Sequence, residues 1–198
     1  MRAFLLSAAL LGLVAPTTLQ AQGAPDRSRV VAATYTVDPG HTQVLFTVNH
    51  QGFTEYTGQF TQPSGTMTLD PAHPEAAKIE IVFPIDKVST TVPALDAHLK
   101  TADFFDAAKF PEGRFVSTKV TTNGTNATIA GNLTLKGVSK PVTLQARFVG
   151  AGKGRNGKTT VGFAATTVVK RSDWGVSFAL PAVSDEVKLT INAAFVEK

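Results

Sequence analysis

The side chains in this sequence best suited to acid-base chemistry are Asp96, His98 and Asp173. Carboxylate and imidazole groups can exchange protons near neutral pH when their surroundings adjust their pKa values. No Gly-x-Ser-x-Gly elbow and no phosphate-binding glycine loop accompanies them. We therefore expect structural roles instead: Asp103 and Asp173 cap or brace turns, and Arg171 pairs with a nearby acid. We predict no catalytic residue. An enzyme that acts on a lipid or small substrate through Asp96, His98 or Asp173 is the alternative.

A metal site needs several ligands close together, and the histidines of this chain are dispersed. His41, His50, His73 and His98 fall in four separate segments, with no His-x-His pair and no His-Glu-x-x-His motif. The chain has no cysteine, which excludes disulfides, thiolate ligands and cysteine nucleophiles. We predict neither a metal nor a cofactor.

The segment of about residues 92–108 is the only one with helical periodicity. Leu95 and Leu99 share one helical face, and Phe104 and Phe105 follow them, so the segment carries a sizeable apolar surface. The pattern predicts one short helical excursion. Two roles remain open for it, a plug in a β structure and a cover over a bound ligand.

The rest of the chain alternates apolar and polar residues with a period of two. Short alternating runs are separated by turn signals such as Asn123-Gly124 and Lys136-Gly137. The pattern predicts an all-β, antiparallel barrel or sandwich, and we favour the barrel because closure leaves no exposed strand edge.

Small residues occupy the middle of several apolar strand faces. They are Gly131, Ala146, Ala165 and Ala193. If these faces point inward, side chains do not fill the middle of the barrel, and it has room for an elongated apolar ligand. Equally, small residues allow large neighbours to interdigitate in a packed core. The sequence leaves both interpretations open.

The N-terminus has the layout of a cleaved secretory signal peptide. Arg2 precedes an apolar run that is too short to span a bilayer, and a polar segment follows that ends at Ala21. We predict a signal peptide over residues 1–21 with cleavage after Ala21. A flexible mature N-terminus follows over residues 22–33, and one barrel domain over residues 34–198.

The charge pattern bears on the partners of the protein. The net charge is +4, but the basic residues are scattered, which argues against a nucleic-acid partner. Lys153, Arg155 and Lys158 are favoured as part of a solvated loop over residues 150–158, with transient contact to a membrane surface as the alternative. A small outer-membrane barrel is less favoured, because 2 Tyr and 1 Trp are too few for aromatic girdles.

Several ordered segments resemble the YceI-like family of exported, lipocalin-like proteins. They are residues 41–50, 58–60, 95–115, 131–142 and 171–175, and the resemblance runs from about Tyr35 to the end. It implies a lipocalin-like antiparallel barrel in the bacterial periplasm that binds a polyisoprenoid, an isoprenoid quinone or a fatty amide. The family more often has Phe or Tyr where this chain has Trp174, and it has no fixed set of catalytic residues.

We therefore predict an exported carrier, monomeric or homodimeric, that sequesters a long-chain amphiphile in its barrel. The residues predicted to line the cavity are mainly aromatic side chains: Phe46, Val48, His50, Phe53, Phe60, Phe83, Leu99, Phe104, Phe105, Phe163, Trp174 and Phe178.

Overall fold

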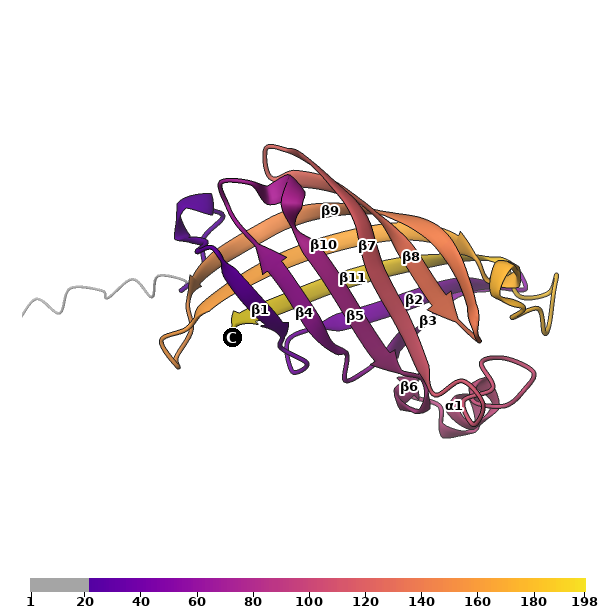
Figure 1. The fold of residues 1–198 in the computed structure, drawn as a ribbon. Coiled ribbons are helices and arrows are strands. Elements are labelled where there is room, and N and C mark those ends of the chain that lie inside the picture. Colours follow the sequence, from indigo (N-terminus) through magenta and orange to yellow (C-terminus); the bar gives the residue numbers. More distant parts are fainter. Residues whose placement is uncertain (1–21) are drawn as a thin grey trace, which may run out of the picture.

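The alternating segments form an 11-stranded antiparallel sheet, and eight of its strands close into a ring (Figure 1). The computed structural model describes residues 22–198. β1 pairs with β4 on one side and with β11 on the other, which completes the ring. The ring strands are β1 (Ala33–Val37), β4 (Ser64–Leu69), β5 (Lys78–Pro84), β7 (Glu112–Asn123), β8 (Asn126–Leu135), β9 (Val138–Lys153), β10 (Thr159–Lys170) and β11 (Glu186–Glu197).

Three further strands extend the wall at one end: β2 (Gln43–His50), β3 (Thr54–Phe60) and β6 (Val88–Ser89). β2 pairs with β11 beyond the point where β1 pairs with it, so β1 and β2 follow one another along the same edge of β11. β3 then pairs with β2, and β6 pairs with β3. The sequence prediction of an all-β antiparallel barrel is confirmed.

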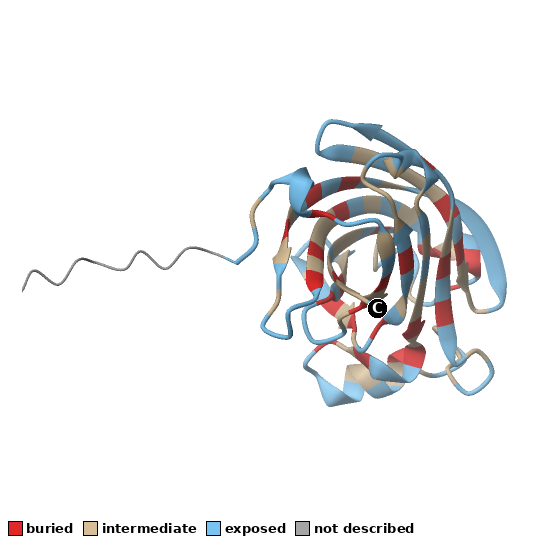
Figure 2. Cartoon of the chain, turned by 60° about the vertical axis from the view of Figure 1, so that its left-hand side comes forward, coloured by how far each residue is buried: buried red, intermediate tan, exposed pale blue. Residues whose placement is uncertain are grey.

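The period of two places apolar side chains inside the barrel and polar ones outside. On β11, Leu189 and Ile191 face the interior, whereas Lys188 and Asn192 are exposed. Figure 2, turned so that the N-terminal end comes forward, shows this alternation as bands of buried and exposed residues along the strands. Alternation is what a strand produces when one of its faces is buried.

Two apolar clusters lie at the two ends of the barrel. The cluster at the η1 (Arg27–Arg29) end surrounds Tyr35, whose hydroxyl donates to the Val31 carbonyl at 2.6 Å. The other cluster contains Phe60, Phe83 and Trp174 and receives side chains from the helical excursion. We call these two regions the η1 end and the α1 end.

The helical excursion is shorter than the predicted residues 92–108. α1 covers only Pro93–Leu99, and the chain continues to Phe110 in hydrogen-bonded turns. Asp106 has a φ of 51°, a left-handed conformation that no α-helix can contain. Short 3-10 turns complete the connections: η2 (Pro74–Ala76), η3 (Ile85–Lys87) and η4 (Arg171–Trp174).

Two segments predicted to be loose contact the barrel. β9 extends into the predicted loop 150–158 as far as Lys153, and its Ala151 is buried opposite Val161 of β10. Residues 22–33 lie along the wall: Ala24 exchanges two backbone hydrogen bonds with Ala151, and Val30 is buried.

The predicted signal peptide, residues 1–21, lies outside the described residues. Within residues 22–198, none of the helices has the length and apolar character that a membrane-spanning helix requires.

Candidate ligand-binding cavity

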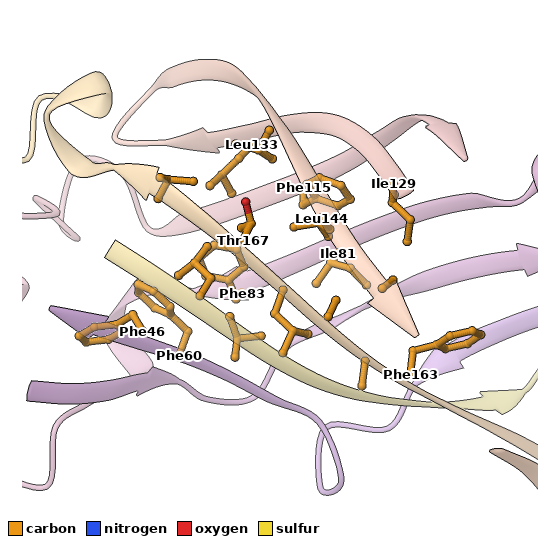
Figure 3. Close-up of a pocket in the computed structure, with 18 of the residues that line it drawn as sticks. Phe46, Phe60, Ile81, Phe83, Phe115, Ile129, Leu133, Leu144, Phe163 and Thr167 are labelled. Carbon is orange, nitrogen blue, oxygen red and sulfur yellow. The ribbon is translucent and has the colours of Figure 1, made fainter. Parts of the chain in front are cut away.

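The inward-facing side chains surround a cavity of about 700 Å³ that runs along the barrel (Figure 3). Small-molecule sites in proteins usually measure about 300–1,000 Å³. β11 contributes lining residues from Val187 to Phe195, which corresponds to about 26 Å of strand at about 3.3 Å per residue. The cavity is therefore long, and its wall is almost entirely apolar.

Glycines opposite phenylalanines keep this lumen open. Phe46 pairs with Gly58, and Phe83 pairs with Gly113. At either glycine, a Cβ atom would overlap the phenylalanine ring. Each ring therefore lies flat on the wall, where a larger residue would push it into the lumen.

The small residues in the middle of the strands have both of the roles that the sequence left open: some allow large neighbours to pack, and others leave free volume. The space beside Gly131 is filled by the ring of Phe115, as in a packed core. By contrast, Ala146, Ala165 and Ala193 line the cavity. Packing and free volume therefore coexist at this level of the barrel.

The helical excursion packs on a row of aromatic rings. The Phe60 ring lies 5.4 Å from that of Phe46 and 4.9 Å from that of Phe83, between centroids. Phe105 reaches the same ring edge-on at 5.4 Å. These distances are typical of stabilising aromatic pairs. The excursion thus forms part of the cavity wall at the α1 end.

Two loops meet over the α1 end through a second aromatic cluster. His98 contacts Phe104 at 5.0 Å and Phe178 at 5.1 Å between ring centroids, and the two phenylalanines are 5.3 Å apart. His98 Nε2 lies 2.9 Å from Asp103 Oδ2. The cluster joins the loop after α1 to the loop that follows η4, and both loops narrow the mouth.

Trp174 and Arg171 hold the loop after η4 in place. The Trp174 indole is buried and donates from Nε1 to the Leu133 carbonyl at 3.0 Å. The sequence predicted that Arg171 pairs with a nearby acid, but its guanidinium donates to four backbone carbonyls, those of Val176, Phe178, Val183 and Ser184. Burial lowers the pKa of Arg171, and the charge of Asp185 opposes this shift.

Asp185 gives the same loop a dependence on pH. Its carboxylate accepts from the Ser172 hydroxyl at 2.7 Å and from the Ser172 amide at 2.9 Å, and these bonds hold its pKa below the ordinary 3.8. A lowered folded-state pKa stabilises the fold above the unfolded-state pKa, and the contribution is lost as the pH falls through the folded-state value.

We expect the wild type to lose this contribution below about pH 4, whereas Asp185→Asn should show a shallower loss of stability with acid. Urea unfolding between neutral pH and the acid limit measures this difference. Identical acid dependence of the two proteins would contradict it.

The side chains suited to acid-base chemistry do not form a common site. Asp96 accepts from the Thr90 hydroxyl at 2.6 Å and so braces the start of α1, and His98 contacts Asp103 as described above. Asp173 is exposed in η4. Over residues 22–198, no group of three metal-ligating side chains comes together.

The predicted cavity residues lie on the cavity wall except Phe53. Phe53 is 80% exposed because it occupies the turn between β2 and β3, outside the barrel. Contact of the others with a ligand stays a prediction. The sequence reasoning favoured aromatic residues and so missed other inward positions of the same alternating runs: Ile81, Leu144, Thr167, Leu189 and Ile191.

The fold has counterparts among solved structures. BcnA of Burkholderia cenocepacia superimposes with a TM-score of 0.73 at 23% identity, covering 80% of this chain and 98% of that protein. The YCEI protein of Campylobacter jejuni gives 0.68 at 32% identity, covering 76% and 90%. A polyisoprenoid binding domain from Saccharophagus degradans gives 0.61 at 14% identity, covering 85% and 100%.

Sequence comparison points the same way. Protein YceI of Salmonella arizonae is 38% identical over 170 residues, which cover 85% of this chain and 89% of that protein. The YceI-like domain model matches residues 35–195, which include all the strands of the barrel except the ends of β1 and β11. On this evidence, the chain belongs to the YceI-like family.

Proposed function

We propose that this protein is an exported carrier that sequesters a long apolar or amphiphilic molecule in its barrel. The observation that supports the proposal is the long cavity with an almost wholly apolar wall. We extend to this chain, as part of the proposal, the polyisoprenoid binding for which the Saccharophagus degradans domain is named. Candidate ligands are polyisoprenoids, isoprenoid quinones and fatty amides.

The hydrophobic effect supplies enough free energy for such binding. Each buried CH₂-sized unit contributes about 0.8 kcal/mol, so a tail of about twenty carbons contributes about 16 kcal/mol. Association costs about 4–15 kcal/mol in lost freedom of motion. A long tail is therefore needed for tight binding.

Purification without detergent, followed by native mass spectrometry and lipid identification, tests the carrier function. We expect a co-purifying molecule with a long isoprenoid or acyl chain. Repeated recovery of empty protein that also fails to bind prenylated quinones and fatty amides would contradict the proposal.

Trp174 provides a direct optical assay, since it is the one tryptophan of the sequence and lines the cavity. Quinones quench indole fluorescence on contact. A prenylated quinone should quench Trp174 at a concentration at least about a hundredfold lower than the same quinone ring without its tail, because the tail provides the buried apolar area. Equal potency of the two compounds would show that the tail is not held in the barrel.

We further propose that the carrier works in the periplasm after cleavage of residues 1–21. N-terminal sequencing of the protein recovered from a periplasmic extract should begin at Gln22. An uncleaved protein in the membrane fraction would oppose this part of the proposal.

A further inference from the structure

One polar group points into the apolar part of the cavity, nearer to the α1 end than to the η1 end. Thr167 lies on the inward face of β10, opposite Leu189 of β11. Figure 3 shows its oxygen directed into the cavity, among apolar side chains. Within residues 22–198, its hydroxyl forms no hydrogen bond to another protein group, and it is not sealed off from the lumen.

The other polar groups along the wall are engaged or lie at the rims. Thr42 donates its hydroxyl to the Ala194 carbonyl, Thr90 donates to Asp96, and Arg171 donates to four carbonyls. The remaining polar lining residues occupy the two mouths. They are Arg27, Thr122, Thr125, Asn126 and Arg147 at the η1 end, and His50, Thr54, Tyr56 and His98 at the α1 end.

A hydroxyl in an apolar environment is costly unless it finds a hydrogen-bond partner. An alkyl chain alone would cover Thr167 without satisfying it. We propose that Thr167 hydrogen-bonds an uncharged oxygen or amide group of the ligand, so that the polar head enters the barrel with the tail. The inference rests on the proposed carrier function and defines the chemistry of its ligand.

Charge decides which heads this site accepts. The lining neighbours of Thr167 along β10 and β11 are Ala165, Val169 and Leu189, which offer no positive charge. The guanidinium of Arg171, further along β10, is occupied by backbone carbonyls. A phosphate or carboxylate at Thr167 would lose its hydration without gaining a countercharge, which costs several kcal/mol. The site therefore selects an alcohol, an amide or a quinone carbonyl.

The position of Thr167 also orients the tail. From its partner Leu189 to Phe195, the lining of β11 continues for about 20 Å of strand towards the η1 end, at about 3.3 Å per residue. Towards the α1 end, β10 adds only Val169 before η4 begins. The long tail extends towards the η1 end, and the head faces the α1 end.

The experiment uses diphenylhexatriene, a hydrocarbon dye without polar atoms, as the reporter of an apolar cavity. Tetradecanol, tetradecanamide and tetradecyl phosphate, which share one tail, compete with the dye for the wild type, Thr167→Val and Thr166→Val. Thr166 is the matched control, because it is the adjacent residue on the exposed face of β10.

We expect the alcohol and the amide to displace the dye from the wild type at least about tenfold more effectively than the phosphate. Thr167→Val, which keeps the side-chain shape, should weaken the alcohol and the amide by about three- to tenfold, the usual effect of one lost hydrogen bond. It should leave dye uptake and phosphate competition unchanged, and Thr166→Val should match the wild type throughout.

The outcomes separate this inference from the carrier function. If the wild type takes up neither the dye nor any long-chain competitor, the carrier function itself fails. If the dye binds and Thr167→Val competes like the wild type, the head does not reach Thr167. Stronger displacement by the phosphate would also overturn the inference and would place an anionic head beside Arg27 or Arg147 at the η1 end.

Discussion

Gly58→Ala is expected to weaken the binding of a long-chain ligand by about fiftyfold while the barrel still forms. The new methyl group overlaps the ring of Phe46, so the ring must swing into the lumen. A displaced ring takes the space of about three CH₂ units of ligand, each worth about 0.8 kcal/mol, so binding loses about 2.4 kcal/mol. Overpacking also lowers the free energy of unfolding by about 1–3 kcal/mol.

Gly113→Ala should weaken ligand binding in the same way at a second position of the wall. Its methyl group overlaps the ring of Phe83 and approaches Leu135. Two separate glycines that cause the same loss would show that ring position controls the volume of the cavity.

The matched control is Gly162→Ala, in β10. A Cβ atom there comes no closer than 3.8 Å to its neighbours, so the change adds a methyl group to a strand without moving a ring. Titration of all three variants with a prenylated quinone, followed through Trp174, measures the effect, and circular dichroism verifies the fold. Wild-type affinity in Gly58→Ala and Gly113→Ala would show that ligands do not use this part of the lumen.

Arg171→Met should lower the free energy of unfolding by about 3–5 kcal/mol. Methionine fills much of the same volume, but four backbone carbonyls lose their charged donor in a site that is 8% exposed. Buried groups left without their charged partner cause losses of this size. The loop after η4 should lose its order, and with it the position of Phe178 at the mouth.

Arg114→Met is the control for this experiment. Arg114 lies 2.7 Å from Glu80, but both side chains are about half exposed, and such pairs contribute about 0–1 kcal/mol. Urea unfolding monitored by circular dichroism compares the two variants. An equally small loss in both would mean that water replaces the guanidinium of Arg171 without cost.

The barrel could be predicted from the sequence because its signal is local. Alternation along each run fixes which side chains face inward, as Leu189 and Ile191 do, and turn residues mark where runs end. The short helix was overestimated for a local reason as well: the Leu95 and Leu99 pattern is helical, but the left-handed residue Asp106 follows it. Apolar periodicity carries no information about backbone conformations of that kind.

The site was less predictable because it depends on contacts between distant segments. Phe53 is aromatic, as the cavity residues were expected to be, but it lies in a turn and is exposed. Arg171 was assigned an acidic partner, since carbonyl acceptors do not show in a sequence. Thr167 was missed because the strands contain many threonines, and the sequence does not show that this one lies among apolar side chains.

The two ends of the barrel differ in how completely their strands are paired, and this difference should determine where the barrel opens first. The strand ladder is complete around the η1 end, whereas β6 contributes two pairs with β3, and within residues 22–198 it pairs with no other strand. Beside β6 the wall is closed by α1 and its aromatic neighbours. Separating α1 from the barrel breaks side-chain contacts and no strand ladder, so backbone amides there should exchange with solvent before those of β9 to β11. At this flank, opening the barrel would break fewer strand hydrogen bonds than it would between β9, β10 and β11.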